Sequence, residues 1–217
     1  VTPERRSKLL LGTAVTVSVY GEGSGEIIDA VFERVAEIEA KMSVSEDDYP
    51  TTELLQVNRA AGVEPVLVSP DTFEVVSRAL EFSRRTRGAF DVSVEPLVKL
   101  WAIGTEYAAV PPEQDIAATL QLVDYHEVEL DPFGRTIYLP RRGMGVDVGG
   151  IAKGYAADEA ARILRDAGVA HALLDFGGNI YTVGHKPDGS LWRIGIQEPF
   201  DNRGQYLGIV TVNDAAV

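Results

Sequence analysis

The residues best suited to chemistry stand close together in the stretch MGVDVGGIAK, which begins at Met144. Asp147 precedes two adjacent glycines, and Lys153 follows inside the first turn of a predicted helix. A helix N-terminus presents unpaired N–H groups and the positive end of the helix dipole, and glycines let a ligand approach the backbone. The pattern is typical of a phosphate site, although a tight strand-to-helix turn would use the same residues.

Two further clusters combine polar residues with glycine, namely RGAFDVSVEPL, which begins at Arg87, and LDFGGNI, which begins at Leu174. Each of them alone is more often a turn than a site. Taken together with the first stretch, they could line one phosphate-rich pocket. Asp91 and Asp147 would then accept hydrogen bonds, and Lys153 would act as a point charge.

Several common catalytic signatures are missing from the sequence. A P-loop needs Ser or Thr after its lysine, whereas a glycine follows Lys153, and a dinucleotide fingerprint would need a third glycine where Val148 stands. The chain has no cysteine and no Gly-x-Ser-x-Gly elbow. The histidines lack metal-ligand spacing and are expected at the surface or in loops: His126, His171 and His185.

Composition limits the class of protein further. A chain of 217 residues with 45% hydrophobic residues can bury a full core, and its length fits one large domain as well as two small ones. We expect a single domain over residues 1–217. The net charge of −13, without long runs of Lys or Arg, argues against a nucleic-acid partner. No stretch reaches the length of a membrane span. The chain opens on Val1 rather than Met, which is compatible with a targeting segment upstream.

The pattern of apolar residues predicts an α+β fold with a mostly antiparallel sheet flanked by helices. Alternation over residues 12–21 predicts a half-buried strand, and apolar spacing predicts helices over 24–42, 69–87 and 151–167. The middle helix carries Ser69 as its N-cap and Pro70 in its first turn. The Pro-rich stretch near Pro112 is expected to begin a helix, residues 131–134 a hairpin turn, and the chain after Gly168 several short strands.

These motifs resemble those of the ApbE-type FAD:protein FMN transferases, also called flavin-trafficking or thiamine-biosynthesis lipoproteins. DVGGIAKGYAADEAARIL, ALLDFGGNIYTVG and WRIGIQEP look like the signature region of that family. LGTAVTVSVYG resembles its opening strand, KMSVSEDDYPTTELLQVNRAAG its loop and helix ending in Leu-x-x-Asn, and TRGAFDVSVEPLVKLWAIG its Gly-Ala-Phe-Asp segment. The order and spacing agree over nearly the whole chain.

The resemblance implies an ApbE-like fold and Mg²⁺-dependent cleavage of FAD. FMN would be transferred to a Thr or Ser hydroxyl of an acceptor protein in a membrane redox complex, with release of AMP. One alternative is an Mg²⁺-dependent FAD pyrophosphatase that gives FMN and AMP, and another is a non-catalytic flavin-binding or storage lipoprotein. The resemblance also implies a lipoprotein on the periplasmic side of the inner membrane, held there only by a lipid anchor upstream of this chain.

The resemblance assigns roles to individual residues as well. It places the FAD against seven of them, with Lys153 as charge stabiliser, and makes the backbone carbonyl of Gly150 a magnesium ligand. Leu11 stands where the family has Met, and Ser45 stands where relatives often carry Tyr or Asn. The family domain is expected to continue past Val217, so that this chain would be its N-terminal two-thirds and the catalytic residue would lie beyond it. The seven FAD-contacting residues are Leu11, Ser45, Ala89, Phe90, Asp91, Asp147 and Lys153.

Overall fold

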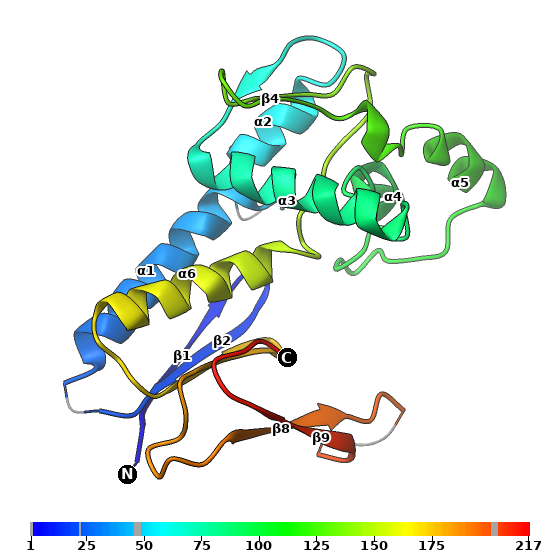
Figure 1. Ribbon diagram of the computed structural model, residues 1–217. Coiled ribbons are helices and arrows are strands. Elements are labelled where there is room, and N and C mark those ends of the chain that lie inside the picture. The colour runs from blue at the N-terminus through cyan, green and yellow to red at the C-terminus, as the bar shows by residue number, and fades with distance from the viewer. Residues whose placement is uncertain (1, 22, 46–48, 201–203) are drawn as a thin grey trace. The chain divides into compact units, whose positions relative to one another are not determined.

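The computed structural model describes the chain apart from residues 1, 22, 46–48 and 201–203. The chain forms two compact units. The first unit consists of Val1–Glu39 and Lys153–Val217, and the second is the intervening Ala40–Ala152. The first unit is blue and then yellow to red in Figure 1, and the second is mainly cyan and green. The sequence-based expectation of one domain over residues 1–217 stays a prediction.

The first unit contains a four-stranded antiparallel sheet in the order β1-β2-β6-β7. Its strand β2 was expected to be half-buried, and this was wrong, because every residue from Val15 to Val19 is buried. The polar side chains of Thr16 and Ser18 on its second face are buried too, and Thr16 Oγ1 forms a 2.8 Å hydrogen bond with Ser7 Oγ. The four strands are β1 (Glu4–Leu10), β2 (Thr13–Val19), β6 (Ala172–Phe176) and β7 (Asn179–Val183).

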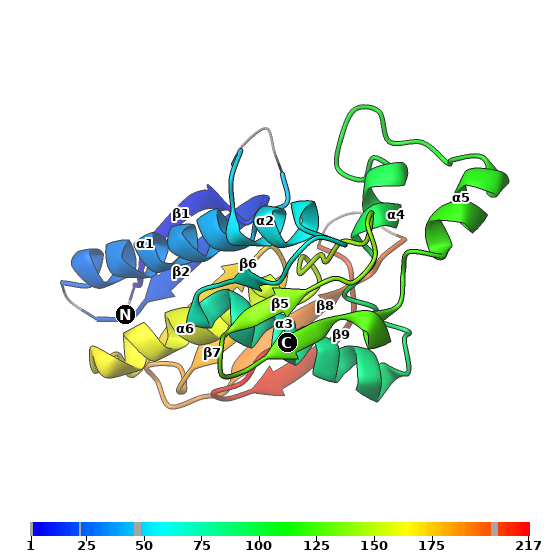
Figure 2. The same ribbon diagram turned by 90° about the horizontal axis from the view of Figure 1, so that it is seen from above.

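Two helices run along this sheet, α1 (Gly25–Met42) and α6 (Ala152–Asp166), and they lie side by side in both views (Figures 1 and 2). Each helix buries apolar residues at intervals of three and four, the spacing that the sequence predicts. The buried residues are Ile28, Val31, Phe32, Val35 and Ile38 on α1, and Ala156, Ala160 and Leu164 on α6.

The first unit ends in an antiparallel hairpin of β8 (Trp192–Gln197) and β9 (Tyr206–Val212). Trp192 anchors the hairpin, because its side chain is buried, its indole N–H donates to Gly184 O at 2.7 Å and its ring lies 5.7 Å from that of Tyr20. The short strands predicted after Gly168 are therefore confirmed.

The second unit combines helices with a three-stranded antiparallel sheet in the order β3-β5-β4. The expected hairpin at residues 131–134 is the turn between β4 and β5, and the expected helix after Pro112 is α5. The elements are α2 (Glu53–Arg59), β3 (Val66–Leu67), α3 (Pro70–Thr86), α4 (Glu95–Leu100), α5 (Glu113–Leu120), the 3-10 turn η1 (Tyr125–Glu127), β4 (Glu129–Asp131) and β5 (Thr136–Tyr138).

Helix α3 begins and ends where the sequence predicts, but the capping differs in detail. Ser69 is the N-cap residue, yet its side chain forms no capping bond. Its backbone N–H and its Oγ instead donate to Glu53 Oε2, at 3.0 and 2.8 Å, which ties the start of α3 to α2. At the other end Arg87, with φ of 56°, takes the left-handed conformation before Gly88.

The α+β class with antiparallel sheets is thus confirmed. Among the residues that the structure describes, no helix is both long enough and apolar enough to span a bilayer.

Candidate functional site

Two of the three clusters of polar and glycine residues lie side by side in the second unit. A parallel bridge joins Val94 to Gly145, and the backbone N–H of Asp147 donates to Val92 O at 2.9 Å. The segment that follows Asp91 therefore runs beside the segment that leads to Asp147. The third cluster, around Asp175 and Gly178, belongs to the β6–β7 turn of the first unit, where Asp175 Oδ1 accepts from the Gly178 N–H at 2.8 Å.

Gly150 is packed beneath an aromatic ring. A Cβ atom built on Gly150 would lie 2.9 Å from Cε2 of Phe90, closer than real contacts allow. Glycine at this position is what lets the half-buried Phe90 side chain cover the backbone. The predicted magnesium-binding carbonyl and the predicted FAD-contacting Phe90 are therefore neighbours, whereas Ala89 is exposed next to them.

The turn from Asp147 to the start of α6 contains hydrogen-bonding groups that have no partner among the described residues. Asp147 Oδ1 accepts from the Gly149 N–H at 2.6 Å, and Val148 O accepts from the Ala152 N–H at 2.8 Å. Within the described part of the chain, Asp147 Oδ2 accepts no hydrogen bond, and the N–H groups of Gly150 and Lys153 donate none. One free carboxylate oxygen and two free N–H groups therefore stand at this helix start, and free N–H groups here attract an anion.

Asp91 has a structural task of its own. Its Oδ1 accepts from the backbone N–H and Oγ of Ser93, at 2.8 and 2.6 Å, and its Oδ2 accepts from the Tyr125 N–H at 3.3 Å. These bonds fix the loop that carries Ala89 and Phe90. A carboxylate can accept more hydrogen bonds than the three formed here, so Asp91 has acceptor capacity left for a ligand. The predicted contact between Asp91 and FAD stays a prediction.

Sequence reasoning left Asn58 out of the site. Its Nδ2 donates to Val146 O at 3.0 Å and its Oδ1 accepts from the Val146 N–H at 2.8 Å. The amide thus pairs with both backbone groups of the residue directly before Asp147, as a neighbouring strand would. The sequence marks Asn58 as the last residue of the Leu-x-x-Asn motif. It does not show that the Asn58 side chain forms hydrogen bonds with the Val146 backbone.

Leu11 and Lys153 belong to the first unit. Leu11 sits in the β1–β2 turn at φ of 53°, a left-handed conformation that is uncommon for a residue with a side chain, and its N–H donates to Glu39 Oε1 at 2.8 Å. Lys153 is the second residue of α6. Its half-buried side chain forms no ion pair with any residue that the structure describes.

Ser45 is exposed in the loop after α1, beside residues that lie outside the described part of the chain. Its N–H donates to Ser43 Oγ at 3.1 Å, and its carbonyl accepts from the Tyr49 N–H at 3.0 Å. The small Ser45 side chain offers no aromatic surface at this position.

The pairing of His126 is local. His126 is exposed, and its Nδ1 lies 2.7 Å from Asp124 Oδ1. Hydrogen bonds from the His126 backbone and ring lower the pKa of the Asp124 carboxyl. Over the described ranges no group of three or more His, Cys, Asp or Glu side chains is arranged to hold a metal ion. The oxygens of Gly150 and Asp147 are nonetheless the hard donors that magnesium prefers.

The fold matches that of solved ApbE structures. The ApbE protein of Thermotoga maritima superimposes with a TM-score of 0.89 at 27% identity, covering 99% of this chain and 69% of that one. The H257G mutant of flavin transferase ApbE from Vibrio cholerae gives a TM-score of 0.85 at 27% identity, covering 100% of this chain and 72% of that one.

The sequence comparisons agree with the structural ones. The family model described as "ApbE family" matches residues 11–217, and the chain belongs to this family. It is 34% identical to the FAD:protein FMN transferase of Klebsiella pneumoniae over 211 residues, which cover 97% of this chain and 64% of the relative. It is 31% identical to the protein of the same name from Treponema pallidum over 229 residues, which cover 98% and 62%. The chain thus spans just under two thirds of the length of these relatives.

Proposed function

We propose that this protein is an FAD:protein FMN transferase. It cleaves FAD at the pyrophosphate, transfers FMN to a Thr or Ser hydroxyl of an acceptor protein and releases AMP. The observation that carries the proposal is the start of α6, where free N–H groups, a free carboxylate oxygen and the unpaired Lys153 follow one another along the chain. The family membership and the names of the two relatives support the same reaction.

The proposed reaction is a phosphoryl-type transfer. The acceptor oxygen forms a bond to the FMN phosphorus, the bond from that phosphorus to the bridging oxygen breaks, and the hydroxyl proton is lost as AMP departs with the bridging oxygen. Such reactions depend mainly on positioning and on stabilising charge on the transferring oxygens. Bound Mg²⁺ would supply part of that stabilisation, with the Gly150 carbonyl as one of its ligands.

Residues of this chain would contribute to the stabilisation as well. The Lys153 ammonium neutralises charge on the pyrophosphate oxygens, and the N–H groups of Gly150 and Lys153 donate to them. Phe90 covers the backbone at Gly150 and keeps water from that side of the phosphate, which strengthens each electrostatic contact.

Ser45 favours a second candidate function, that of an FAD pyrophosphatase. In that reaction water takes the place of the acceptor hydroxyl, and the products are FMN and AMP. An exposed small side chain beside the flavin would leave room for such a water, which an aromatic side chain would fill. A flavin-storage protein, which would bind the same FAD without breaking it, is the remaining alternative.

The acceptor and the cellular location are part of the proposal. We propose an acceptor protein in a membrane redox complex, and a lipoprotein location on the outer face of the inner membrane, both from the resemblance to the family.

The deciding experiment incubates the purified full-length protein with FAD and Mg²⁺, with and without an acceptor protein that carries an accessible threonine. Transfer predicts AMP release that depends on the acceptor, together with flavin fluorescence that stays on the acceptor band after denaturing electrophoresis. A pyrophosphatase would release AMP and free FMN equally well without the acceptor. FAD that is bound but recovered intact would identify a storage protein and contradict the transferase.

A further inference from the structure

Two hydroxyl side chains near the end of helix α3 hold the loop that leads into the proposed flavin site. Ser83 and Thr86 stand three residues apart, so they are neighbours on the helix surface. Each hydroxyl donates to a carbonyl four residues back in α3, Ser83 Oγ to Ala79 O at 3.0 Å and Thr86 Oγ1 to Phe82 O at 2.9 Å. Both oxygens keep their lone pairs for a donor outside the helix.

Those lone pairs accept backbone N–H groups on either side of Asp91. Ser83 Oγ accepts from the Val92 N–H at 3.3 Å, and Thr86 Oγ1 accepts from the Phe90 N–H at 3.0 Å. Helix α3 therefore holds both residues that flank Asp91.

The two bonds to the loop differ in burial. Ser83 and Val92 are fully buried, so their bond belongs to the core, and the Val92 carbonyl in turn accepts from the Asp147 N–H at 2.9 Å. Thr86 is exposed, and its bond to Phe90 lies at the surface. Solvent can replace a surface hydrogen bond, so the Thr86 hydroxyl adds little to the stability of the fold.

Phe90 gives the Thr86 bond its importance. The Phe90 ring packs over the Gly150 backbone, 2.9 Å from the point where a Cβ atom would stand. The turn that leads to Phe90 contains two successive residues with positive φ, Arg87 at 56° and Gly88 at 82°. A ring whose backbone is already fixed loses less conformational freedom when a ligand arrives, which favours binding.

We propose that Thr86 is a positioning residue of the flavin site, whose hydroxyl fixes the Phe90 backbone so that the ring covers Gly150 before FAD binds. This inference rests on the proposed function, because it takes Phe90 as a contact of FAD. In this proposal Thr86 does not touch FAD and acts only through Phe90.

The test measures the FAD affinity of the full-length protein by calorimetry. Thr86→Val keeps the shape of the side chain and removes the hydroxyl, so we expect FAD to bind about fivefold more weakly, the size of one typical hydrogen bond. The melting temperature should not change, because Thr86 is exposed. Thr86→Ser keeps the hydroxyl and should bind FAD as the wild type does. Weak binding by the Ser variant as well would contradict the proposal.

Thr105→Val is the matched control. Thr105 Oγ1 donates to Ala102 O at 2.8 Å and accepts from the Tyr107 N–H at 3.1 Å, the same pair of bonds in an exposed loop that carries no predicted FAD contact. Its substitution should leave FAD affinity unchanged. An equal loss of affinity in Thr105→Val and Thr86→Val would show a general effect of lost loop bonds and would refute a specific role for Thr86.

A double substitution tests whether Thr86 acts through Phe90. Adding Thr86→Val to Phe90→Ala should weaken FAD binding no further than Phe90→Ala alone, because the ring that Thr86 positions is already missing. Wild-type affinity in Thr86→Val, or the same loss of about fivefold in the Phe90→Ala background, would overturn the inference. A wild-type protein that does not bind FAD would overturn the proposed function, and this inference with it.

Discussion

A lysine in the first turn of a helix stands at the positive end of the helix dipole, where a cation is unfavourable unless an anion offsets it. Lys153 has this position and no ion-pair partner among the described residues, so we assign its partner to the FAD pyrophosphate. Lys153→Ala should weaken FAD binding by about 1.5–3 kcal/mol without lowering stability. Calorimetry checks the affinity, with Lys186→Ala in the β7–β8 loop as the control. Unchanged affinity in the Lys153 variant would remove that residue from the site.

Ser45 decides how long flavin stays bound if the ring lies against it. Ser45→Tyr should add a stacking surface worth about 0.5–1.5 kcal/mol and slow flavin release by a corresponding factor. Stopped-flow flavin fluorescence measures the off-rate, and Ser45→Leu controls for added bulk without stacking geometry. Equal off-rates in the wild type and the Tyr variant would place the ring elsewhere.

Residues that act through their sequence neighbours were the easiest to predict. Asp147, Gly150 and Lys153 form a recognisable pattern because all three stand at one helix start. Asn58 was missed for the opposite reason. Its partner Val146 is distant in the sequence and is met only through tertiary pairing.

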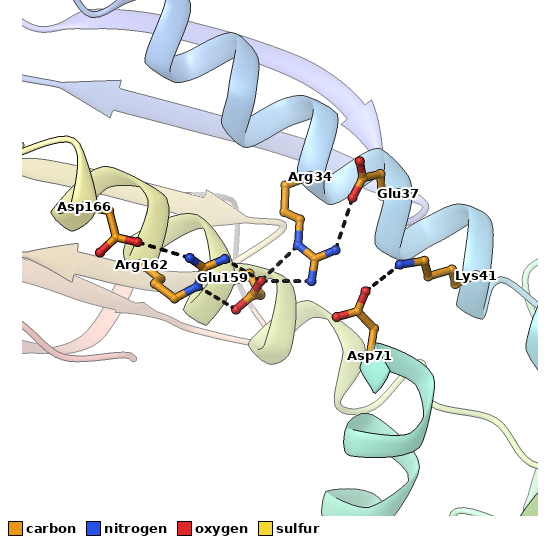
Figure 3. A network of polar contacts seen from close by, with 7 residues as sticks. All are labelled: Arg34, Glu37, Lys41, Asp71, Glu159, Arg162 and Asp166. Carbon is orange, nitrogen blue, oxygen red and sulfur yellow. Dashed lines mark hydrogen bonds and ion pairs between the residues drawn. The ribbon is translucent and has the colours of Figure 1, made fainter. Parts of the chain in front are cut away.

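Helices α1 and α6 are joined by a half-buried ionic network in the first unit (Figure 3). Arg34 Nη2 lies 2.9 Å and Arg162 Nη2 3.0 Å from Glu159 Oε2, and the side chains of Arg34 and Glu159 are each 18% exposed. Hydrogen bonds from Arg162 and then from Arg34 lower the pKa of Glu159 below its ordinary value of 4.5, although burial opposes the shift. The network therefore holds the two helices together in its ionised form. Lys41 and Asp71, also drawn in Figure 3, form a separate 2.6 Å ion pair in the second unit.

The depressed pKa of Glu159 sets the direction of the pH dependence. The folded state binds the proton less readily than the unfolded state does, so this stability is present above the ordinary value of 4.5 and is lost as pH falls toward the folded-state pKa. Glu159→Gln should reduce the melting temperature at neutral pH and have a smaller effect at about pH 3. Thermal melts across that range, with Glu33→Gln at an exposed position of α1 as the control, measure the change in melting temperature. If the difference in melting temperature between the wild type and Glu159→Gln grew on acidification, ionised Glu159 would not be the stabilising form.

The pairing of Asn58 with Val146 aligns the segment that leads to Asp147. Val146 is fully buried, so Asn58→Ala leaves a buried N–H and a buried carbonyl without partners and should destabilise the protein by about 1–3 kcal/mol. Asn58→Asp retains the acceptor for the Val146 N–H and should reduce the free energy of unfolding by a smaller amount. Urea unfolding gives both values. If the two variants were equally stable, the amide would not be acting through both of its bonds.

Helices were predicted well because caps and apolar spacing are local signals, as α3 shows. Strand β1 was not predicted at all. Its sequence, ERRSKLL, is largely exposed and polar, and it becomes a strand only because it pairs with β2 over its full length. The burial of both faces of β2 was missed for the same reason, since the sequence does not show what covers the second face.

On the scale of the whole molecule, the chain builds its first unit from two distant segments and inserts the second unit between them. Strand β2 pairs with β6, which lies on the far side of the insertion. Such an arrangement leaves no composition change or linker in the sequence, since the chain passes between the units within α1 and α6. Family resemblance supplied the order of the motifs, but the division into units came only from the structure.

The two units should differ in how they respond to local destabilisation. Each has its own buried core, with Val17 and Phe176 in the first and Leu80 and Ile137 in the second. Proteins open in cooperative parts when such parts have separate cores. Glu159→Ala should therefore speed hydrogen exchange mainly for amides of β2 and β6.

Asn58→Ala supplies the reciprocal measurement, because its unsatisfied groups lie in the second unit. It should speed exchange mainly for amides of α3 and β5 and leave β2 and β6 as protected as in the wild type. Native-state hydrogen exchange at low denaturant, followed by mass spectrometry of the intact protein's peptides, resolves the two sets of amides. If either substitution sped exchange equally in both sets, the molecule would open as one cooperative whole, and ligand contacts made in one unit would stabilise the other to the same extent.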